Sequence, residues 1–363
     1  MSLVNFNSLC SFEETARLIC NIGQSVTVVV RAEPGVGKSS LLRHVHEKLG
    51  LDLYNPVYLD CPTINDGDLG MNIPNRDTKS MEFMVSSMLR LDEGKPIILM
   101  LDEILKTDSM MKKIFARLIL ERCIGDRKLP DGSVVFATSN LGSDGLNDTV
   151  QGHEGNRVLF VEMSKPDHKA WNVWATAKKI SSITRSLVSL KPQLLQSYRT
   201  LSANDLAANP YIYNPSKKTV TYVSPRSLAL ADVVVQRRQI LGEELTRKSL
   251  AGVIGEAAAN LFSTFIMMEK DLTPISEILK APDSVTMPQT AGALLMTMFN
   301  AIDEIQTQDD LSKFMQFVNR VENEEYRDVF MSQVVESTRT AKLAMQNAQI
   351  TKWYQNNFKI MSN

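Results

Sequence analysis

The sequence is short of cysteine and contains no long apolar run. Its four cysteines, Cys10, Cys20, Cys61 and Cys123, include no C-x-x-C pair, so neither a zinc knuckle nor a disulfide framework is predicted. No apolar run reaches the roughly 18 residues that cross a membrane, and residues 1–10 lack the charged-then-apolar order of a signal peptide. We therefore expect a cytoplasmic protein without a membrane span, or one of the host cytoplasm if a virus encodes it.

An excess of basic charge is also absent. Lysine and arginine number 40 against 41 aspartates and glutamates, a formal charge of -1. Proteins built mainly to hold nucleic acid usually carry a basic excess, so nucleic acid is the less favoured partner, although a local basic patch is not excluded. The four histidines show no metal-ligand spacing. The 363 residues predict about two domains, and the 44% hydrophobic content predicts a full core.

The first 165 residues alternate short β-branched runs with helical patterns, which predicts strands joined by crossover helices and a mostly parallel sheet. We place five strands at residues 25–31, 56–61, 96–101, 133–138 and 157–163. We place helices at residues 38–49, 80–89 and 110–123. From Lys165 onward apolar residues recur at helical spacing, with one short strand expected at 217–223. The predicted fold is therefore an α/β core followed by a helical region.

The first strand runs directly into a loop rich in small residues, and a helix follows it. The loop residues are Ala32, Glu33, Pro34, Gly35, Val36, Gly37, Lys38, Ser39 and Ser40. This strand, loop and helix order is that of a Walker A loop, in which backbone N–H groups surround phosphates and the lysine reaches the terminal ones. Ser39 is a candidate Mg²⁺ ligand. Ala32 takes the first glycine position of the motif, which requires a negative φ there.

Two further polar positions follow buried strands. Asp102 and Glu103 end the apolar run 97–101, and Asn140 ends the run 134–138. The carboxyl ends of parallel strands share the edge where ligands bind. We therefore expect Asp102 to hold Mg²⁺, Glu103 to orient the attacking water, and Asn140 to contact that water or the γ-phosphate. ATP and Mg²⁺ are the predicted cofactors.

Two arginines are further candidates. Arg157 precedes the last strand, too far along the sheet to serve its own nucleotide. Arg226 follows Pro225 at the start of a predicted helix in the second half, from which it could reach over the nucleotide and sense the γ-phosphate.

With these elements in one order, the chain resembles the AAA+ ATPases, and within them the MoxR-like branch. The resemblance rests on AEPGVGKSS (32–40), IILMLDEI (97–104), GDRKLPDGSVVFATSN (125–140), NRVLF (156–160), SPRSL (224–228) and GEAAANLFSTF (255–265). It implies a three-layer P-loop NTPase core with a five-stranded parallel sheet at 1–165, a helical lid carrying a second sensor at 166–245, and a helical extension at 246–363. It covers nearly the whole chain.

The resemblance also implies a ring, most often a hexamer, with ATP sites shared between subunits. Arg157 would then come from the next protomer and Arg226 from the lid. Residues 68–74 look like the loop that faces the central pore in this branch, although their spacing is altered. MoxR-like ATPases generally act as chaperone-like remodellers and are often encoded beside a partner with a von Willebrand factor A domain. The D-x-S-x-S pattern of such a domain is missing from the sequence, so that partner would be a separate chain.

Three functions remain open. The leading one is ATP hydrolysis that drives remodelling or assembly of a protein partner, as a chaperone does. The second is a nucleic-acid motor, loader or restriction component on the same core, against which the charge balance argues mildly. The third is a nucleotide-dependent scaffold or switch that hydrolyses slowly, against which the presence of Glu103 argues.

Overall fold

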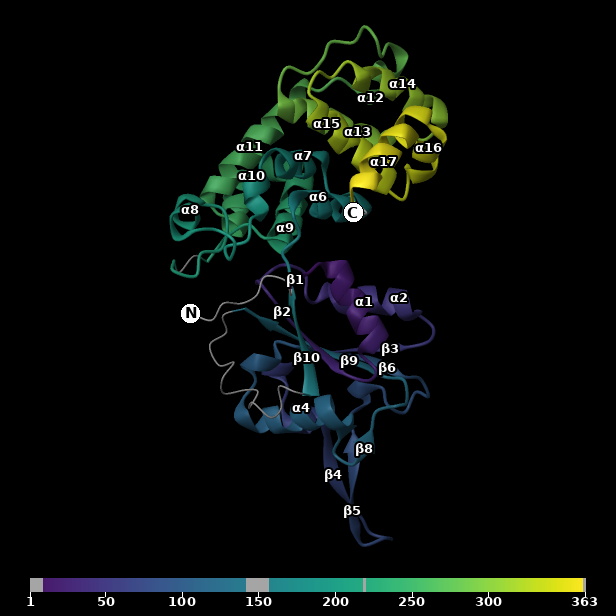
Figure 1. The fold of residues 1–363 in the computed structure, drawn as a ribbon. Coiled ribbons are helices and arrows are strands. Elements are labelled where there is room, and N and C mark those ends of the chain that lie inside the picture. Colours follow the sequence, from purple (N-terminus) through teal and green to yellow (C-terminus); the bar gives the residue numbers. More distant parts are fainter. Residues whose placement is uncertain (1–8, 142–156, 218–219, 362–363) are drawn as a thin grey trace. The chain divides into compact units, whose positions relative to one another are not determined.

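The computed structural model describes residues 9–141, 157–217 and 220–361. The chain divides after Lys165 into two compact units, and each is described by itself. Figure 1 colours the first unit from purple to teal and the second from teal to yellow. The first unit contains all the described strands, and in its described residues the second is helical.

The first unit is built on a six-stranded sheet in which every neighbouring pair is parallel. In spatial order the strands are β1 (Leu9–Cys10), β10 (Val158–Met163), β2 (Thr27–Ala32), β9 (Val134–Asn140), β6 (Ile97–Asp102) and β3 (Asn55–Asp60). All five strands expected from the sequence are present, and the short edge strand β1 is an addition to them. The predicted fold class, a parallel α/β core followed by a helical region, is confirmed.

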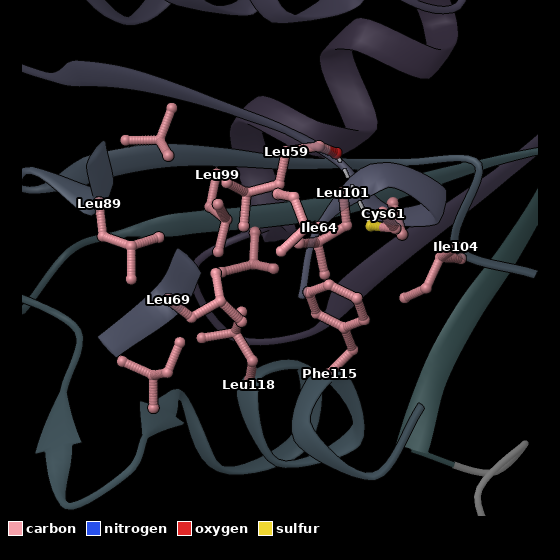
Figure 2. Close-up of a cluster of buried hydrophobic side chains, with 14 of the residues drawn as sticks. Leu59, Cys61, Ile64, Leu69, Leu89, Leu99, Leu101, Ile104, Phe115 and Leu118 are labelled. Carbon is pink, nitrogen blue, oxygen red and sulfur yellow. Dashed lines mark hydrogen bonds between the residues drawn. The ribbon is translucent and has the colours of Figure 1, made fainter. Parts of the chain in front are cut away.

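Helices cover both faces of this sheet (Figure 1). The covering helices are α1 (Phe12–Ile22) and α2 (Ser40–Leu49) on one face and α4 (Ser109–Glu121) on the other. Side chains of β6 alternate between the two layers, since Met100 belongs to the α1–α2 core and Leu99 and Leu101 belong to the α4 core. Figure 2 shows Phe115 and Leu118 of α4 packed against this second face. The first unit is therefore a three-layer sandwich.

The strand order sets the carboxyl ends of β2, β9 and β6 side by side. Ala32 pairs with Asn140 across the β2–β9 ladder, and Asp60 pairs with Asp102 across the β3–β6 ladder. Because parallel strands end at the same edge, the polar residues that follow them meet along that edge.

A hairpin stands where a helix was predicted at residues 80–89. Its strands are β4 (Gly70–Asn75) and β5 (Ser80–Val85), which pair antiparallel. Met81 and Met84 have helical spacing, but the ring of Phe83 packs into the α4 core and against Gly125. A Cβ at Gly125 would lie 2.4 Å from that ring. The helix prediction is wrong because this packing and the cross-strand pairing override local spacing.

Two smaller differences concern local signals. Helix α1 was not expected, although Ser11 and Glu14 form a capping box at its start and their spacing is visible in the sequence. In the described part of residues 217–223 there is no strand, so the short strand expected there is not found in that part.

The second unit is an array of helices. They are α6 (His168–Ala177), α7 (Ser182–Leu190), α8 (Ala203–Ala208), α9 (Pro225–Gln236), α10 (Arg238–Ile254), α11 (Glu256–Met268), α12 (Ile275–Lys280), α13 (Ala291–Glu304), α14 (Gln308–Asn319), α15 (Glu324–Glu336), α16 (Ala341–Gln346) and α17 (Ala348–Met361). Leu250 and Phe262, from α10 and α11, share a core with α6, α7 and α9, while α12 to α17 surround a second core. Helix α10 is kinked at Gly242, and the division expected at residue 245 stays a prediction. Within the described ranges, none of the helices is long and apolar enough to cross a membrane.

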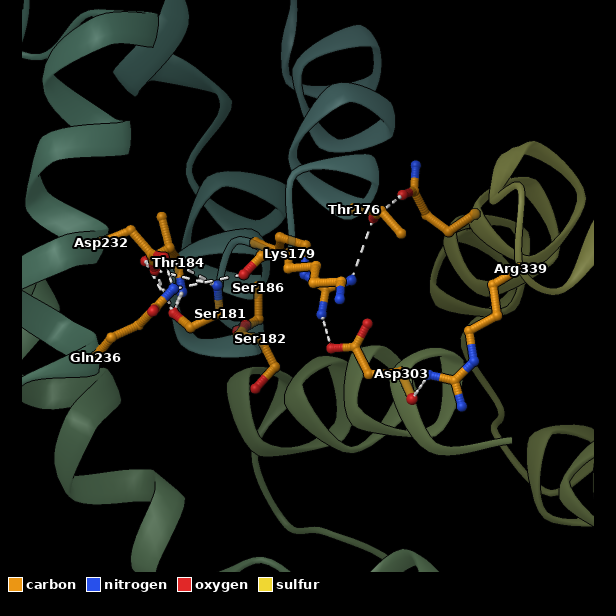
Figure 3. A network of polar contacts seen from close by, with 12 residues as sticks. Thr176, Lys179, Ser181, Ser182, Thr184, Ser186, Asp232, Gln236, Asp303 and Arg339 are labelled. Atoms are coloured by element: carbon orange, nitrogen blue, oxygen red, sulfur yellow. Dashed lines mark hydrogen bonds and ion pairs between the residues drawn. The ribbon is translucent and has the colours of Figure 1, made fainter. Parts of the chain in front are cut away.

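Two polar contacts join helices within this unit (Figure 3). Asp232 of α9, only 1% exposed, accepts hydrogen bonds at the amino end of α7, including one from Thr184 Oγ1 at 2.7 Å. Arg185 of α7 has a fully buried side chain that donates to Asp303 of α13 and lies over the Phe299 ring at 4.9 Å. The second contact links the two cores of the unit.

Candidate nucleotide site

The loop after β2 has the backbone that phosphate binding requires. Gly35 and Gly37 have φ values of 77° and 102°, in the region that glycine adopts without strain. No atom lies within 4 Å of where a Cβ on Gly37 would stand, outside the glycine and its chain neighbours. Ala32 is the last residue of β2, and its φ is not positive, so its Cβ is tolerated at a position where the motif has glycine.

The remaining loop residues fix this backbone at both ends. Val36 is 5% exposed and packs into the α1–α2 core, which anchors the middle of the loop. Glu33 is buried and Pro34 is half-buried. Ser39 is the N-cap residue of α2, and Ser40 is its first residue. The amino end of a helix therefore directs its backbone N–H groups toward the loop, where an anion is favoured.

Lys38 is held inside this loop. Its side chain is 6% exposed, and Nζ donates to the backbone carbonyls of Ala32 and Glu33 at 3.4 and 3.1 Å. Nζ also donates to Oδ1 of Asn140 at 2.6 Å. The ammonium group is thus placed between the loop and the end of β9, where it can exchange these oxygens for those of a phosphate.

Asp102 is surrounded by hydroxyl groups. Ser39 Oγ and the Tyr58 phenol donate to its Oδ2 at 3.3 and 2.8 Å, and Thr138 Oγ1 donates to its Oδ1. The carboxylate is 6% exposed. A serine hydroxyl beside a carboxylate is the kind of oxygen donor set that Mg²⁺ accepts together with phosphate oxygens. The residues present therefore fit a Mg²⁺ ion that is bound with a nucleotide.

Glu103 lies next to Asp102 in a left-handed backbone conformation, with φ 55° and ψ 36°. This conformation is costly for a residue with a side chain, and such strain clusters at functional sites. Its Oε1 accepts from Asn140 Nδ2 at 2.6 Å, its Oε2 pairs with Lys106, and its backbone N–H donates to Thr138 Oγ1 at 3.4 Å. The carboxylate is therefore held at both oxygens, and the backbone of Glu103 is held by Thr138.

Asn140 connects the two halves of the site. Its carbonyl oxygen accepts from Lys38 and its amide nitrogen donates to Glu103, so both ends of the amide have a partner. The result is a continuous chain of polar contacts from the loop lysine through Asn140 and Glu103 to Lys106. A group that binds at the loop can therefore alter the contacts of Glu103 through a single side chain.

Of the two candidate arginines, Arg157 lies at the opposite end of the strands from this constellation, and Arg226 belongs to the second unit. Arg157 is exposed and immediately precedes β10, whose first residue pairs with Thr27 at the start of β2. The loop begins at the other end of β2, five residues on, or roughly 16 Å at 3.3 Å per residue. Arg226 is exposed in the first turn of α9, after the N-cap Ser224, in the second unit. Their roles stay predictions.

Three residues of the site were missed in the sequence. Tyr58 lies on β3 opposite Met100, so it shares a face of the sheet with Asp102. Thr138 lies within the β9 run, and Lys106 lies three residues after Glu103, a separation at which opposite charges meet in helical turns. Burial and the hydrogen bond to Asp102 raise the pKa of the Tyr58 phenol well above its usual value. The phenol is therefore a hydrogen-bond donor at neutral pH.

The comparisons with known proteins give distant likenesses. Neither a protein-family model nor a curated protein matches the sequence. Among solved structures, a presumed ATPase from Cytophaga hutchinsonii is similar over 69% of this chain and 83% of its own, at 13% identity and TM-score 0.29. NtrX from Brucella abortus in complex with ATP is similar over 100% of this chain and 70% of its own, at 12% sequence identity and TM-score 0.34. Hsp104 with casein is similar over 64% of this chain and 42% of its own, at 16% sequence identity and TM-score 0.35.

Proposed function

We propose that this protein is a Mg²⁺-dependent ATPase of the AAA+ kind, of the MoxR-like branch. The observation that carries the proposal is the convergence of Lys38, Ser39, Asp102, Glu103 and Asn140 at one edge of the sheet. These residues come from three strand ends that are far apart in the sequence. A glycine-rich turn with a surface lysine would not require the other four residues beside it.

Each residue has a role that follows from its contacts. Lys38 would bind the terminal phosphates, and the backbone of residues 33–39 would cradle them. Ser39 and Asp102 would hold Mg²⁺, which neutralises charge that develops on the phosphates. Glu103 would orient the attacking water and accept its proton, because its carboxylate is fixed beside Asn140. Asn140 would report to Glu103 whether Lys38 has left it for a phosphate.

The proposal extends to a ring in which sites are shared. Arg157 is exposed at the sheet edge opposite the loop, which suits a residue that completes the site of a neighbouring protomer. Arg226, exposed at the amino end of α9, would act as the second sensor of a lid at residues 166–245. The helices from residue 246 onward would form the extension of this branch.

The proposed work of the ring is to remodel or assemble a protein partner. Residues 70–74 of the segment 68–74, compared above with a pore loop, belong to strand β4 of the β4–β5 hairpin, whose Met71 and Met84 are each 57% exposed. Flexible, exposed methionines suit contact with varied protein segments. A separate protein with a von Willebrand factor A domain remains the expected partner, and the cytoplasm remains the expected location.

The test is to compare ATP binding with ATP turnover in two variants. Lys38→Ala should lose nucleotide binding, whereas Glu103→Gln should bind ATP and lose about 10² to 10⁴ in turnover, the usual contribution of a general base. Binding is measured by calorimetry and turnover by phosphate release. Lys48→Ala is the matched control, because Lys48 lies on α2 and pairs with Glu13 outside the site. Turnover by Glu103→Gln at the rate of the unaltered protein would exclude the proposed mechanism.

A further inference from the structure

Tyr58 contacts the candidate Mg²⁺ carboxylate but belongs to none of the sequence motifs. It lies on β3, the strand beside β6, and its register partner is Met100, two residues before Asp102. Side chains two residues apart on a strand share a face, so the tyrosine ring and the Asp102 carboxylate lie on the same side of the sheet. The residue is 46% exposed, yet its phenol oxygen lies 2.8 Å from Asp102 Oδ2.

The contacts of Asp102 divide between its two oxygens. Thr138 donates to Oδ1, whereas Ser39 and Tyr58 both donate to Oδ2. Oδ2 is therefore the oxygen nearest the candidate Mg²⁺ hydroxyl of Ser39. The final torsion of an aspartate is soft, so the direction of Oδ2 depends on the groups that donate to it.

Of the two hydrogen bonds to Asp102 Oδ2, the one from Tyr58 is shorter than the one from Ser39. At 2.8 Å it has the usual length of an O–H···O bond, whereas the Ser39 contact of 3.3 Å is long. The Ser39 hydroxyl is also the group that would coordinate the metal ion. When it turns to the ion, Tyr58 is the donor that still holds Oδ2, and Thr138 still holds Oδ1.

We propose that Tyr58 is a positioning residue that fixes the Asp102 carboxylate for Mg²⁺. The inference rests on the proposed nucleotide site and adds to it a residue from a strand outside the Walker motifs. Outer partners of metal-binding groups usually change metal affinity by about 10- to 100-fold when they are removed. Tyr58→Phe should therefore lower the affinity of the nucleotide-bound site for Mg²⁺ by that factor and leave metal-free nucleotide binding unchanged.

The experiment measures ADP binding by calorimetry, first in excess chelator and then over a series of Mg²⁺ concentrations. In the unaltered chain Mg²⁺ should tighten ADP binding, with a defined half-point. In Tyr58→Phe the affinity in chelator should be the same, and the half-point should lie at about 10- to 100-fold higher Mg²⁺. The melting temperature without nucleotide is recorded to show that both proteins are folded alike.

Tyr54→Phe is the matched control. Its hydroxyl accepts a hydrogen bond from Gln24 Nε2 at 3.1 Å and lies near the start of β3 rather than at Asp102. It should keep the Mg²⁺ half-point of the unaltered chain. An unchanged half-point in Tyr58→Phe would overturn the inference alone. If the unaltered chain binds no ADP at any Mg²⁺ concentration, the proposed nucleotide site is overturned instead.

Discussion

The charged residues of the candidate site are paired with other groups of the protein. Lys38 donates to two loop carbonyls and to Asn140, and Glu103 is shared between Asn140 and Lys106. Binding of a phosphate is therefore an exchange of contacts and does not insert charge into an apolar pocket. This exchange would change the contacts of Asn140 directly, because Asn140 is hydrogen-bonded to both Lys38 and Glu103.

Removal of the Asn140 side chain should affect turnover more than nucleotide binding. In Asn140→Ala, Glu103 loses its amide donor and keeps Lys106. We expect turnover to fall by about 10² or more, as when a positioned donor is lost from an active site, and ATP affinity to change little. Steady-state kinetics separate kcat from KM, and calorimetry gives the affinity. A fall in affinity that accounts for the whole loss of kcat/KM would contradict a role in turnover.

At the scale of elements, α1 and α2 are joined above the sheet by a charged contact. Glu13 of α1 accepts from His44 at 2.8 Å and from Lys48 at 2.5 Å, both on α2. The hydrogen bond from Lys48 is the main cause that lowers the pKa of Glu13 below its usual value. His44 and Lys48 lie four or more residues beyond the first residue of α2, so the contact joins the two helices away from the phosphate loop.

The contact should stabilise the folded chain at neutral pH and less so in acid. The pKa of Glu13 is lower in the folded chain, so its stabilising contribution is present above the usual glutamate pKa of about 4.3 and is lost as pH falls through the lowered value. Glu13→Gln should therefore melt at a lower temperature than the unaltered chain at neutral pH. The free energy of unfolding should fall by under about 1 kcal/mol, because the pair is half-exposed. This difference between the two proteins should disappear in acid.

Melting curves across pH test this. Glu47→Gln is the control, because Glu47 pairs with Arg43 of its own helix and not with α1 in the part of the chain that the structure describes. A gap that stays constant from neutral to acid pH would show that the Glu13 contact does not depend on its charge.

The sequence predicts elements well where the signal is local and continuous. The strand around Val28 to Val30 and the run Ile97 to Leu101 are unbroken apolar segments, and they form strands as expected. The helix predicted at residues 80–89 is wrong because the methionine spacing fits a helix, whereas Phe83 packs against Gly125, which is distant in the sequence. Tyr58 was missed for the same reason, since only the register between β3 and β6 brings it to Asp102.

At the scale of the whole molecule, the proposed mechanism calls for an arginine beside the site. Among the described residues the charged partners of Asp102 and Glu103 include no arginine side chain. Arg157 lies at the opposite edge of the sheet from the loop, so it cannot reach its own site without a change in the sheet. A second copy of the chain is the natural source of this residue in the proposed ring.

Mixing two inactive variants tests this. Arg157→Ala should bind ATP and lose about 10³ to 10⁵ in rate, as for an arginine supplied in trans. Combined with Glu103→Gln it should recover part of the activity, because some sites then have an intact Glu103 facing an intact Arg157. Light scattering with ATP and Mg²⁺ should give the mass of a ring near six protomers.

Arg127→Ala is the control for this experiment, since Arg127 is an exposed arginine that pairs with Asp92 away from the site. It should retain activity alone. No recovery at any mixing ratio, together with a monomeric mass, would rule out shared sites.

The ion pair between α7 and α13 constrains how the chain can be shortened. Arg185 has no exposed surface, and its acidic partner Asp303 and the Phe299 ring both belong to α13. Met296 of α13 belongs to the same core as Leu187 of α7. A fragment that ended before α13 would therefore lose both of these partners of Arg185 and would also expose apolar side chains of α7 to water. The first 270 residues therefore do not form a ready-made minimal protein.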